Sequence, residues 1–226
     1  MDDMRAVVFD WRGTLVTTLS PEDWVRAALD RLGRGSRPES VARTWAAIAE
    51  AAGEPDRLDA PGVDCDAAVH RDAYHGVFAD AGLDAELADA LYAVESDPAF
   101  NPFAVDAAPV LRAIARHGRR IAVVSDVHFD LRPAFAAAGL ADVVDAYVLS
   151  YEHGVQKPDP RAFRLALDML GTVPGQTLMV GDRRQPDGGA LDVGMPTLLL
   201  PPLVDVRHQR LGLVARALGV SVDRSA

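Results

Sequence analysis

Polar side chains that could do chemistry stand where apolar runs of this sequence end. Asp10 ends an apolar run near the N-terminus, Ser125 ends a second, and Asp182 follows a third. Asp187 comes five residues later, and Lys157 stands in a polar segment after another apolar run. A single aspartate in such a place is often only a helix cap, and a single lysine is often only solvated. Because these side chains recur at the same kind of boundary, we predict that they form one site.

The chemistry open to this set is attack on a phosphoryl group or on an activated carbon. A carboxylate can act as the nucleophile and form a covalent intermediate. Clustered carboxylates repel one another unless a cation lies between them, and oxygen ligands of this kind suit Mg²⁺. A hydroxyl and an ammonium can hold the non-bridging oxygens of a phosphate. Since phosphoryl transfer depends mainly on positioning and charge neutralisation, the set favours that reaction.

Short apolar segments rich in β-branched residues predict the strands that must position this site. Helical patterns follow at 130–140 and at 160–171, the second with Gly171 as its C-terminal cap. Strands that alternate with helices of this length form right-handed βαβ units around a parallel sheet. We therefore predict an α/β fold with helices on both faces of the sheet and functional groups at the carboxyl ends of its strands. The predicted strands are 5–10, 120–125, 143–149, 177–181 and 196–200.

Residues 20 to about 100 interrupt this alternation with an alanine-rich segment of helical period. It opens with a good helix start, Ser20 followed by proline, and it contains no strand pattern. A further helical pattern at 101–118 leads the chain back to the sheet. The sequence thus predicts two domains: a Rossmann-like core from 1–17 and 101–226, with one last helix in its tail 205–226, and a helical domain from 18–100.

Composition and charge exclude several classes of function. The 226 residues carry a formal net charge of -10, which is opposite in sign to what a nucleic-acid partner requires. Cys65 is the only cysteine, so no intrachain disulfide can form. Neither a secretory signal nor an apolar run of roughly 18 residues, the length of a membrane span, occurs in the sequence. We therefore expect a soluble cytoplasmic protein, a monomer or homodimer, that binds neither nucleic acid nor membranes.

Four motifs make the sequence similar to the haloacid dehalogenase-like hydrolase superfamily. They are DWRGTL from Asp10, VVSD up to Asp126, GVQKPDP around Lys157 and GDRRQPDGGALDVGM from Gly181. Their order, their places after strands and their spacing make the match more specific than any one motif. The resemblance implies that the helical domain is a cap inserted between the first and second motifs, as in phosphoglycolate phosphatases, β-phosphoglucomutases and haloacid dehalogenases.

The resemblance also implies roles for the site residues. Asp10 is implied to be the nucleophile, and Ser125 and Lys157 are implied to hold the phosphate. The implied substrate-binding residues are Thr14, Ser125, Asp126 and Lys157, and the implied ligands of Mg²⁺ are Asp10, Arg12 through its main-chain carbonyl, Asp182 and Asp187.

Arg12 departs from the family pattern, which has a second aspartate at this position. In the family's phosphatases that aspartate protonates the leaving oxygen and then takes a proton from the attacking water, whereas an arginine stays protonated and does neither. Since general acid–base help is worth roughly 10²–10⁴-fold, we expect slow turnover unless another group, such as Asp126, takes over. Three positions of the Arg12 side chain are open: on the substrate, paired with Asp10 or Asp182 in the cation site, or in solvent.

Other members of the superfamily replace this aspartate too. Haloacid dehalogenases carry a tyrosine there, need no metal and generally lack the Gly-Asp pattern of the fourth motif, which this chain has at Gly181 and Asp182. Phosphonoacetaldehyde hydrolases begin their first motif with Asp-Trp, as here, but require a lysine in the cap. Lys157 is the only lysine of this chain and lies outside the cap, which disfavours that chemistry.

The sequence therefore predicts a Mg²⁺-dependent phosphoric monoester hydrolase that acts on a small phosphorylated metabolite through an aspartyl-phosphate on Asp10. Two alternatives remain open. One is a catalytically degenerate member of the family that binds a phosphorylated ligand or partner, and the other is a metal-independent 2-haloacid dehalogenase.

Overall fold

A parallel β-sheet forms the centre of the protein, for which a computed structural model describes residues 3–222. Within that range the sheet has five strands in the order β3-β2-β1-β4-β5. The first strand is therefore central, between β2 and β4, and residues that follow it emerge at the middle of the sheet edge. The strands are β1 (Ala6–Phe9), β2 (Arg120–Ser125), β3 (Ala146–Leu149), β4 (Thr177–Gly181) and β5 (Thr197–Leu199).

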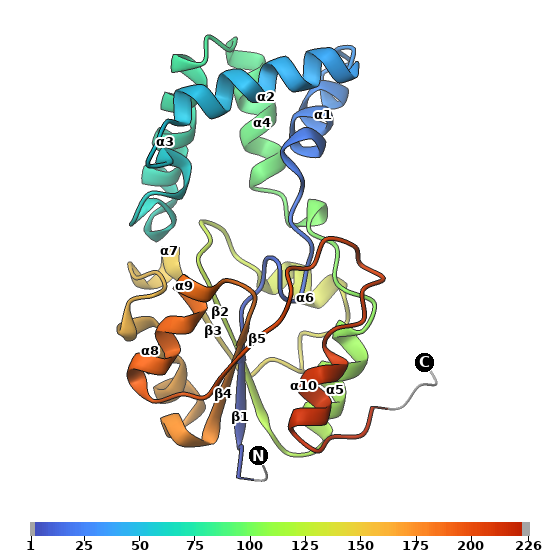
Figure 1. Ribbon diagram of the computed structural model, residues 1–226, viewed down its shortest axis with the longest axis vertical. Coiled ribbons are helices and arrows are strands. Elements are labelled where there is room, and N and C mark those ends of the chain that lie inside the picture. Colours follow the sequence, from blue (N-terminus) through green and yellow to red (C-terminus); the bar gives the residue numbers. More distant parts are fainter. Residues whose placement is uncertain (1–2, 223–226) are drawn as a thin grey trace.

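Helices cover both faces of this sheet, which confirms the predicted α/β architecture (Figure 1). Side chains of successive strand residues point to opposite faces, so Val7 and Phe9 join one apolar cluster while Ala6 and Val8 join the other. The first cluster is covered by α5, α6 and α10, and the second by α8. These helices are α5 (Ala107–Arg116), α6 (Arg132–Ala137), α8 (Pro160–Leu170) and α10 (Gly212–Ala217).

Helix α8 shows how local sequence sets an element of the core. The Asp159 side chain accepts a hydrogen bond from the backbone N–H of Arg161, and Pro160 takes the first helical position, where a backbone donor is not needed. Gly171 ends the helix in the left-handed conformation, as predicted. The amphipathic pattern buries Phe163 against the sheet.

A strand boundary differs from its prediction where buried apolar residues do not pair with a neighbouring strand. The third strand begins at Ala146 rather than at 143, because Val143 and Val144 are buried in the turn before it without joining the sheet. Short helices also lie in the connections between strands, at places where the sequence has no helical period. They are α7 (Ser150–His153), α9 (Arg184–Gly188), η4 (Pro174–Gln176) and η5 (Gly189–Val193). The predicted last helix is α10, and residues 223–226 of the predicted tail lie outside the described residues.

Four α-helices between β1 and α5 form a separate layer with its own apolar cluster, here called the cap. Ser20 caps the first of them by accepting from the backbone N–H of Asp23, as its sequence predicts. The indole of Trp24 donates to the carbonyl of Leu91 over 2.9 Å and links the first helix to the last. The division at residues 18 and 101 stays a prediction. The cap elements are α1 (Pro21–Arg31), α2 (Pro38–Ala52), η1 (Arg57–Asp59), η2 (Val63–Cys65), α3 (Ala67–Asp80), α4 (Ala85–Glu95) and η3 (Pro98–Phe100).

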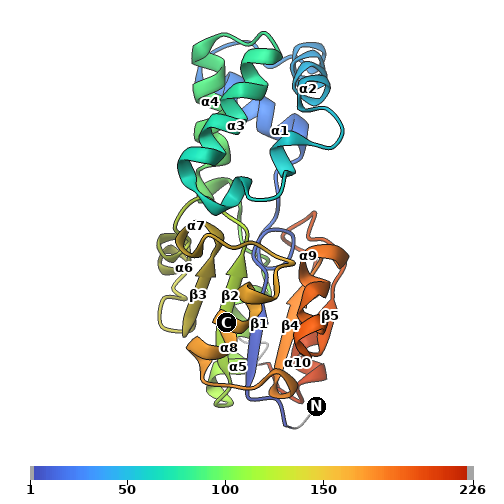
Figure 2. The same ribbon diagram turned by 90° about the vertical axis from the view of Figure 1, so that its left-hand side faces the viewer.

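The cap lies over the carboxyl ends of the strands, and the first residues of β1 lie at the opposite end of the sheet (Figure 2). Two connections join the cap to the core, at Thr17 and Asn101, and they are tied to each other by a hydrogen bond of 2.9 Å from the Asn101 amide to the Thr17 carbonyl. The cap therefore covers the edge at which the polar residues emerge. Between residues 3 and 222, no helix combines the length and apolar character that crossing a lipid bilayer would require.

Phe163 provides a test of the core. Phe163→Ala is expected to lower the free energy of unfolding by about 3–5 kcal/mol, because it leaves a cavity against the sheet where the ring is 0% exposed. Met169→Ala, on the same helix but 48% exposed, is the matched control and should change stability by less than about 0.5 kcal/mol. Urea denaturation followed by circular dichroism measures both, and equal effects would contradict this packing.

Candidate active site

Asp10 follows the central strand directly and is 3% exposed. Its backbone N–H donates to the carbonyl of Val180 over 2.9 Å, which continues the pairing with β4 by one residue. Its Oδ1 lies 2.5 Å from the Lys157 ammonium, and its Oδ2 accepts a hydrogen bond of 3.0 Å from the Thr14 hydroxyl. Both oxygens of the predicted nucleophile are thus held in one orientation.

The Lys157 ammonium lies between two buried carboxylates. Its Nζ is 2.5 Å from Asp10 Oδ1 and 2.7 Å from Asp187 Oδ1, and the Lys157 side chain is fully buried. Burial alone would lower the pKa of this ammonium. The charges of Asp10 and Asp187 raise the pKa by more than burial lowers it, so the group stays protonated. The backbone N–H of Lys157 donates to Asp126 Oδ1 over 2.8 Å, which fixes the loop that carries the lysine.

The loop after β4 is organised by Asp187, which is fully buried. Its Oδ2 accepts hydrogen bonds from the backbone N–H groups of Asp182 and Arg183, at 3.0 and 2.9 Å. Two glycines allow the close approach of these carboxylates. A Cβ at Gly181 would overlap the Asp187 carboxylate, and a Cβ at Gly13, whose φ is 79°, would overlap that of Asp182.

The chain turns sharply after Asp10, and this turn places Thr14 back against the carboxylates. The carbonyl of Trp11 accepts from the backbone N–H groups of Thr14 and Leu15, at 3.2 and 2.8 Å. From the C-terminal part of the chain, the Arg210 guanidinium donates to the Thr14 carbonyl over 2.6 Å. The turn is therefore held by its own backbone hydrogen bonds and by Arg210, a residue that the sequence analysis did not single out.

The cluster of Asp10, Asp182 and Asp187 fits a hard divalent cation. One carboxylate oxygen from each lies within 4.8 Å of the others. Three carboxylates face one ammonium, that of Lys157, so negative charge is in excess. Burial, together with the charges of Asp10 and Asp187, raises the pKa of Asp182 to about 6. A cation bound by oxygen ligands would relieve this repulsion, and Mg²⁺ prefers such ligands.

The remaining predicted residues lie close to this cluster. Ser125 ends β2 and, with Asp126, lines the same pocket as Asp10. Thr14 is fully buried, and its hydroxyl lies 3.3 Å from Asp182 Oδ1 besides donating to Asp10. The structure therefore brings the predicted carboxylates, hydroxyls and ammonium together at one edge of the sheet.

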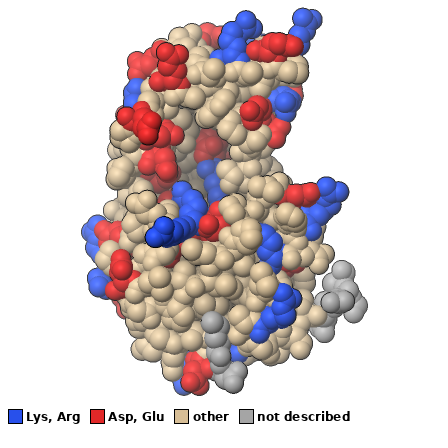
Figure 3. Space-filling model, viewed as in Figure 1, with Lys and Arg blue, Asp and Glu red and all other residues tan. Residues whose placement is uncertain are grey.

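A cavity of about 370 Å³ opens above this edge, between the core and the cap. Figure 3 shows the hollow between the two parts of the molecule, with acidic and basic side chains around it. Its core side is polar, whereas the cap contributes mostly aromatic and aliphatic walls and several further carboxylates. The lining includes Asp10, Arg12, Ser125, Asp126, Asp182 and Arg183 from the core and Trp24, Trp45, Asp59, Asp64, Tyr74, Glu95 and Phe100 from the cap and its connection.

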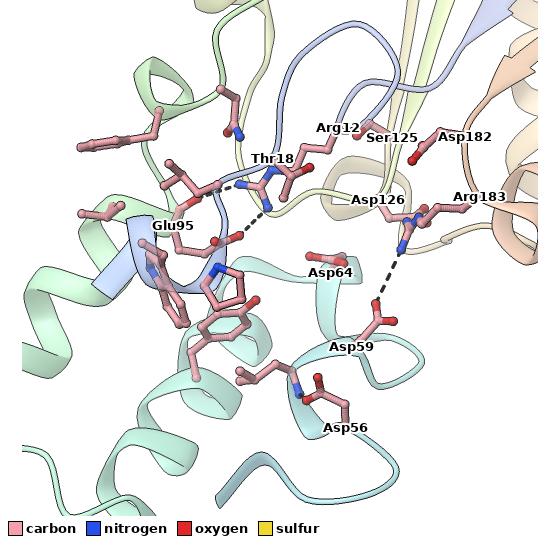
Figure 4. Close-up of a pocket in the computed structure, with 18 of the residues that line it drawn as sticks. Arg12, Thr18, Asp56, Asp59, Asp64, Glu95, Ser125, Asp126, Asp182 and Arg183 are labelled. Atoms are coloured by element: carbon pink, nitrogen blue, oxygen red, sulfur yellow. Dashed lines mark hydrogen bonds and ion pairs between the residues drawn. The ribbon is translucent and has the colours of Figure 1, made fainter. Parts of the chain in front are cut away.

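The Arg12 side chain occupies neither the cation site nor solvent, and because it lines the pocket its predicted contact with a substrate stays a prediction. Its Nη1 is paired with the Glu95 carboxylate at the end of α4, and its Nη2 donates to the Glu95 carbonyl over 2.9 Å (Figure 4). The guanidinium also lies over the rings of Trp11 and Phe129, 5.6 and 5.7 Å from their centroids. Pairing with Asp10 or Asp182 and exposure to solvent were therefore wrong predictions. Arg12 joins the core to the cap, because a cation is favoured at the C-terminal end of a helix.

Sequence reasoning missed the cap carboxylates. Glu95 and Asp64 lie 83 and 52 residues after Arg12 in the chain, and neither stands in a motif. Asp59 pairs with Arg183 at 3.9 Å across the cap–core boundary. The only sequence feature that indicated these carboxylates was the excess of acidic residues in the loops of the helical segment. Acidic side chains in such loops are usually only solvated.

Comparisons with known proteins agree with the motifs. A family model described as haloacid dehalogenase-like hydrolase matches residues 4–191. The chain is 28% identical over 212 residues to a phosphoglycolate phosphatase of Rhodospirillum rubrum, covering 87% of this chain and 79% of that protein. It is 29% identical over 197 residues to an (S)-2-haloacid dehalogenase of Xanthobacter autotrophicus, covering 84% and 72%.

Other comparisons show the fold but not the reaction. A crystal structure described as that of a dehalogenase matches 96% of this chain and 98% of its own with a TM-score of 0.69, but at 22% identity, which speaks to the fold alone. The curated relatives above 30% identity are matched over 35% to 49% of their length. Phosphatases and dehalogenases thus both resemble the chain, and the site must decide between them.

Lys157 offers a test of the charge cluster. Lys157→Met is expected to lower the free energy of unfolding by about 3–5 kcal/mol at neutral pH, because two buried carboxylates lose their shared cation. The loss should shrink in mildly acidic solution, since burial raises the pKa of Asp10 and its protonation then removes the repulsion. Urea denaturation with a metal chelator present measures this, with Arg164→Met, on an exposed residue, as control. A loss that is equal at both pH values would contradict the assignment.

The Arg12–Glu95 pair can be tested by a double-mutant cycle. The two side chains are 27% and 18% exposed, so Arg12→Met and Glu95→Gln should show a coupling of about 1–3 kcal/mol in unfolding free energy. The same cycle on Arg57 and Asp80, which are 48% and 59% exposed, should give less than about 1 kcal/mol. A coupling at Arg12 no larger than that of the surface pair would show that the contact does not join cap and core in solution.

Proposed function

Because the chain belongs to the haloacid dehalogenase-like hydrolase family, we propose that it is a phosphatase that hydrolyses a small phosphorylated metabolite through an aspartyl-phosphate on Asp10. The observation that carries this proposal is the charge cluster below the pocket. Asp10 stands in the middle of the sheet edge, flanked by an ammonium and by two more carboxylates. An excess of negative charge at a nucleophilic carboxylate requires a cation before a phosphate dianion can approach.

The proposed roles follow from the contacts of each residue. Asp10 attacks the phosphorus from a position fixed by the Lys157 ammonium and the Thr14 hydroxyl. Lys157 uses two of its three donors on Asp10 and Asp187, which leaves one for a non-bridging phosphate oxygen. The Ser125 hydroxyl at the end of β2 would hold another phosphate oxygen.

The acidic cluster would hold Mg²⁺ through the carboxylates of Asp10 and Asp182 and the main-chain carbonyl of Arg12, with Asp187 supporting the loop. A bound Mg²⁺ supplies charge neutralisation for the phosphoryl group. Asp187 keeps the backbone of Asp182 in place through the hydrogen bond to its N–H. The pocket volume of about 370 Å³ suits a small metabolite.

The degenerate, purely binding alternative loses its main support in the position of Arg12. That alternative placed the guanidinium in the cation site, paired with Asp10 or Asp182. The guanidinium instead pairs with Glu95 in the cap and does not neutralise the acidic cluster. The dehalogenase alternative requires no metal and gives no use to the acidic cluster, although two relatives are haloacid dehalogenases.

Release of phosphate from p-nitrophenyl phosphate tests the proposed function. The native protein should turn over this activated ester with Mg²⁺ and stop when the metal is chelated, and Asp10→Asn should lose more than about 10³-fold in kcat because the nucleophile is gone. Asp168→Asn, the same change on an exposed residue of α8, should retain full activity.

Other outcomes distinguish the alternatives. Halide release from 2-chloropropionate in the presence of a chelator would select the dehalogenase. A native protein that is inert while Arg12→Asp turns over the ester would select the binding protein, since the scaffold would then be complete but inactive. Turnover that persists in Asp10→Asn would contradict the aspartyl-phosphate itself.

A further inference from the structure

We propose that Asp64, a carboxylate of the cap, is the general acid and base of the phosphatase reaction. This inference rests on the function proposed above and supplies the group that reaction lacks. An alkoxide or phenoxide leaving oxygen needs a proton, and the attacking water must lose one. Arg12 cannot exchange protons at neutral pH, and its guanidinium is engaged by Glu95.

The backbone around Asp64 is anchored to the core, although the residue belongs to the cap. The Ser150 hydroxyl donates to the Asp64 carbonyl over 2.7 Å, and the Gln156 side-chain oxygen accepts from the backbone N–H of Gly62 over 2.6 Å. The short helix η2 therefore contacts α7, directly after strand β3. This anchoring holds a cap side chain at a fixed place over the sheet edge, as acid–base catalysis requires.

The Asp64 carboxylate faces the pocket that Asp10 also lines. In Figure 4 it lies on the cap side, between the Arg12–Glu95 pair and the Arg183–Asp59 pair. The Nε2 atom of His70 lies 3.7 Å from Asp64 Oδ1.

Burial and the charge of Asp126 raise the pKa of Asp64 to about 6, although the charge of Arg12 opposes this shift. Glu95 and Asp59 also face it and favour the protonated form. A carboxyl group that is partly protonated near neutral pH can both give and take a proton.

Other carboxylates of the pocket are already committed to protein partners. Asp126, a candidate from the sequence, accepts from the Lys157 backbone with one oxygen and lies 3.8 Å from the Arg183 guanidinium with the other. Glu95 is engaged by Arg12, Asp56 accepts from the backbone N–H of Leu58, and the Asp59 side chain in η1 is 76% exposed. Among the described pocket carboxylates outside the metal cluster, Asp64 is thus the one best able to exchange protons with a bound ester.

A metal bound by Asp64, His70 and His128 is the competing use of this carboxylate, since their ligand atoms lie within 4.8 Å of one another. The two imidazole rings, however, are stacked with centroids 3.4 Å apart and planes at 15°. A metal binds in the plane of an imidazole ring, and stacked rings do not direct their nitrogens to one point. His128 Nε2 also already contacts the Ser96 hydroxyl at 2.8 Å.

The proposed steps balance in atoms and charge. An Asp10 oxygen forms a bond to phosphorus as the bond to the ester oxygen breaks, and that oxygen keeps the electron pair and takes the proton of Asp64. The resulting Asp64 carboxylate then takes a proton from water while the water oxygen bonds to phosphorus. The bond between phosphorus and Asp10 breaks, its electrons return to the Asp10 carboxylate, and phosphate leaves with Asp64 protonated again.

Asp64→Asn tests both halves of this cycle, because it keeps the shape and the backbone contacts but cannot exchange protons. With phenyl phosphate, whose leaving group needs a proton, steady-state kcat should fall by about 10²–10⁴-fold. With p-nitrophenyl phosphate, transfer of the phosphoryl group to Asp10 should still occur, whereas hydrolysis of the aspartyl-phosphate should not. Stopped-flow should therefore record a burst of p-nitrophenolate equal to the enzyme concentration, and acid quenching should trap phosphate on Asp10.

Two variants control this experiment. Asp72→Asn makes the same change on an exposed cap residue of α3 and should match the native protein. Asp64→Glu keeps a carboxyl group and should recover part of the phenyl phosphate activity. Thermal unfolding shows whether each variant is folded, and if Asp64→Asn is not, the comparison of Asp64→Glu with Asp64→Ser takes its place.

The inference would be overturned if Asp64→Asn stayed within about twofold of the native protein on both esters. It would also be overturned if the folded variant lost activity on both esters equally and showed no burst, since that pattern indicates a loss of substrate binding. Failure of the proposed function has a different signature: the native protein would release no phosphate from either ester with Mg²⁺, and the role of Asp64 would fall with it.

Discussion

The ion cluster around Lys157 is the interaction on which the rest of the site depends. Its ammonium, with no exposed surface, holds Asp10 at 2.5 Å and Asp187 at 2.7 Å, and so joins the ends of β1 and β4 to the loop after β3. Such a buried cation tolerates no loss of either partner. The glycines at 13 and 181 are required because the carboxylates approach the backbone so closely. The cluster still carries an excess of negative charge, and that excess makes it suited to a divalent cation.

At the boundary between core and cap, charged side chains of each part reach into the other, and the residue type at position 12 explains this arrangement. Arg12 extends from the turn after β1 into the cap and pairs with Glu95, while Asp64 extends from the cap toward the core. A guanidinium beside the cluster would have neutralised it, whereas a guanidinium turned to the end of α4 leaves it negative. The same contact links the end of α4 to the turn after β1.

The strands, the order of helices and most residues of the cluster could be predicted because they follow from local pattern. Apolar runs end at Asp10, Ser125 and Asp182, and parallel strands bring such ends to one edge whatever their distance in sequence. The contact between Arg12 and Glu95 could not be predicted in this way. It depends on how two separately packed apolar cores sit on each other, which no periodicity encodes. The third strand was overestimated for a related reason, because buried valines in a turn and in a strand look alike in sequence.

Relatives of this chain include both phosphatases and dehalogenases, which shows that the sheet and the cap do not select the reaction. What can select it is the charge around the nucleophile. Attack on carbon in a haloacid needs a carboxylate that is free of a metal, so an acidic cluster below it would only repel the substrate's own carboxylate. Attack on phosphorus needs that cluster, because a cation held there offsets the charge of the phosphate. The third carboxylate, Asp182, whose pKa burial and its neighbours raise to about 6, is therefore the residue on which the proposed phosphoryl transfer most depends.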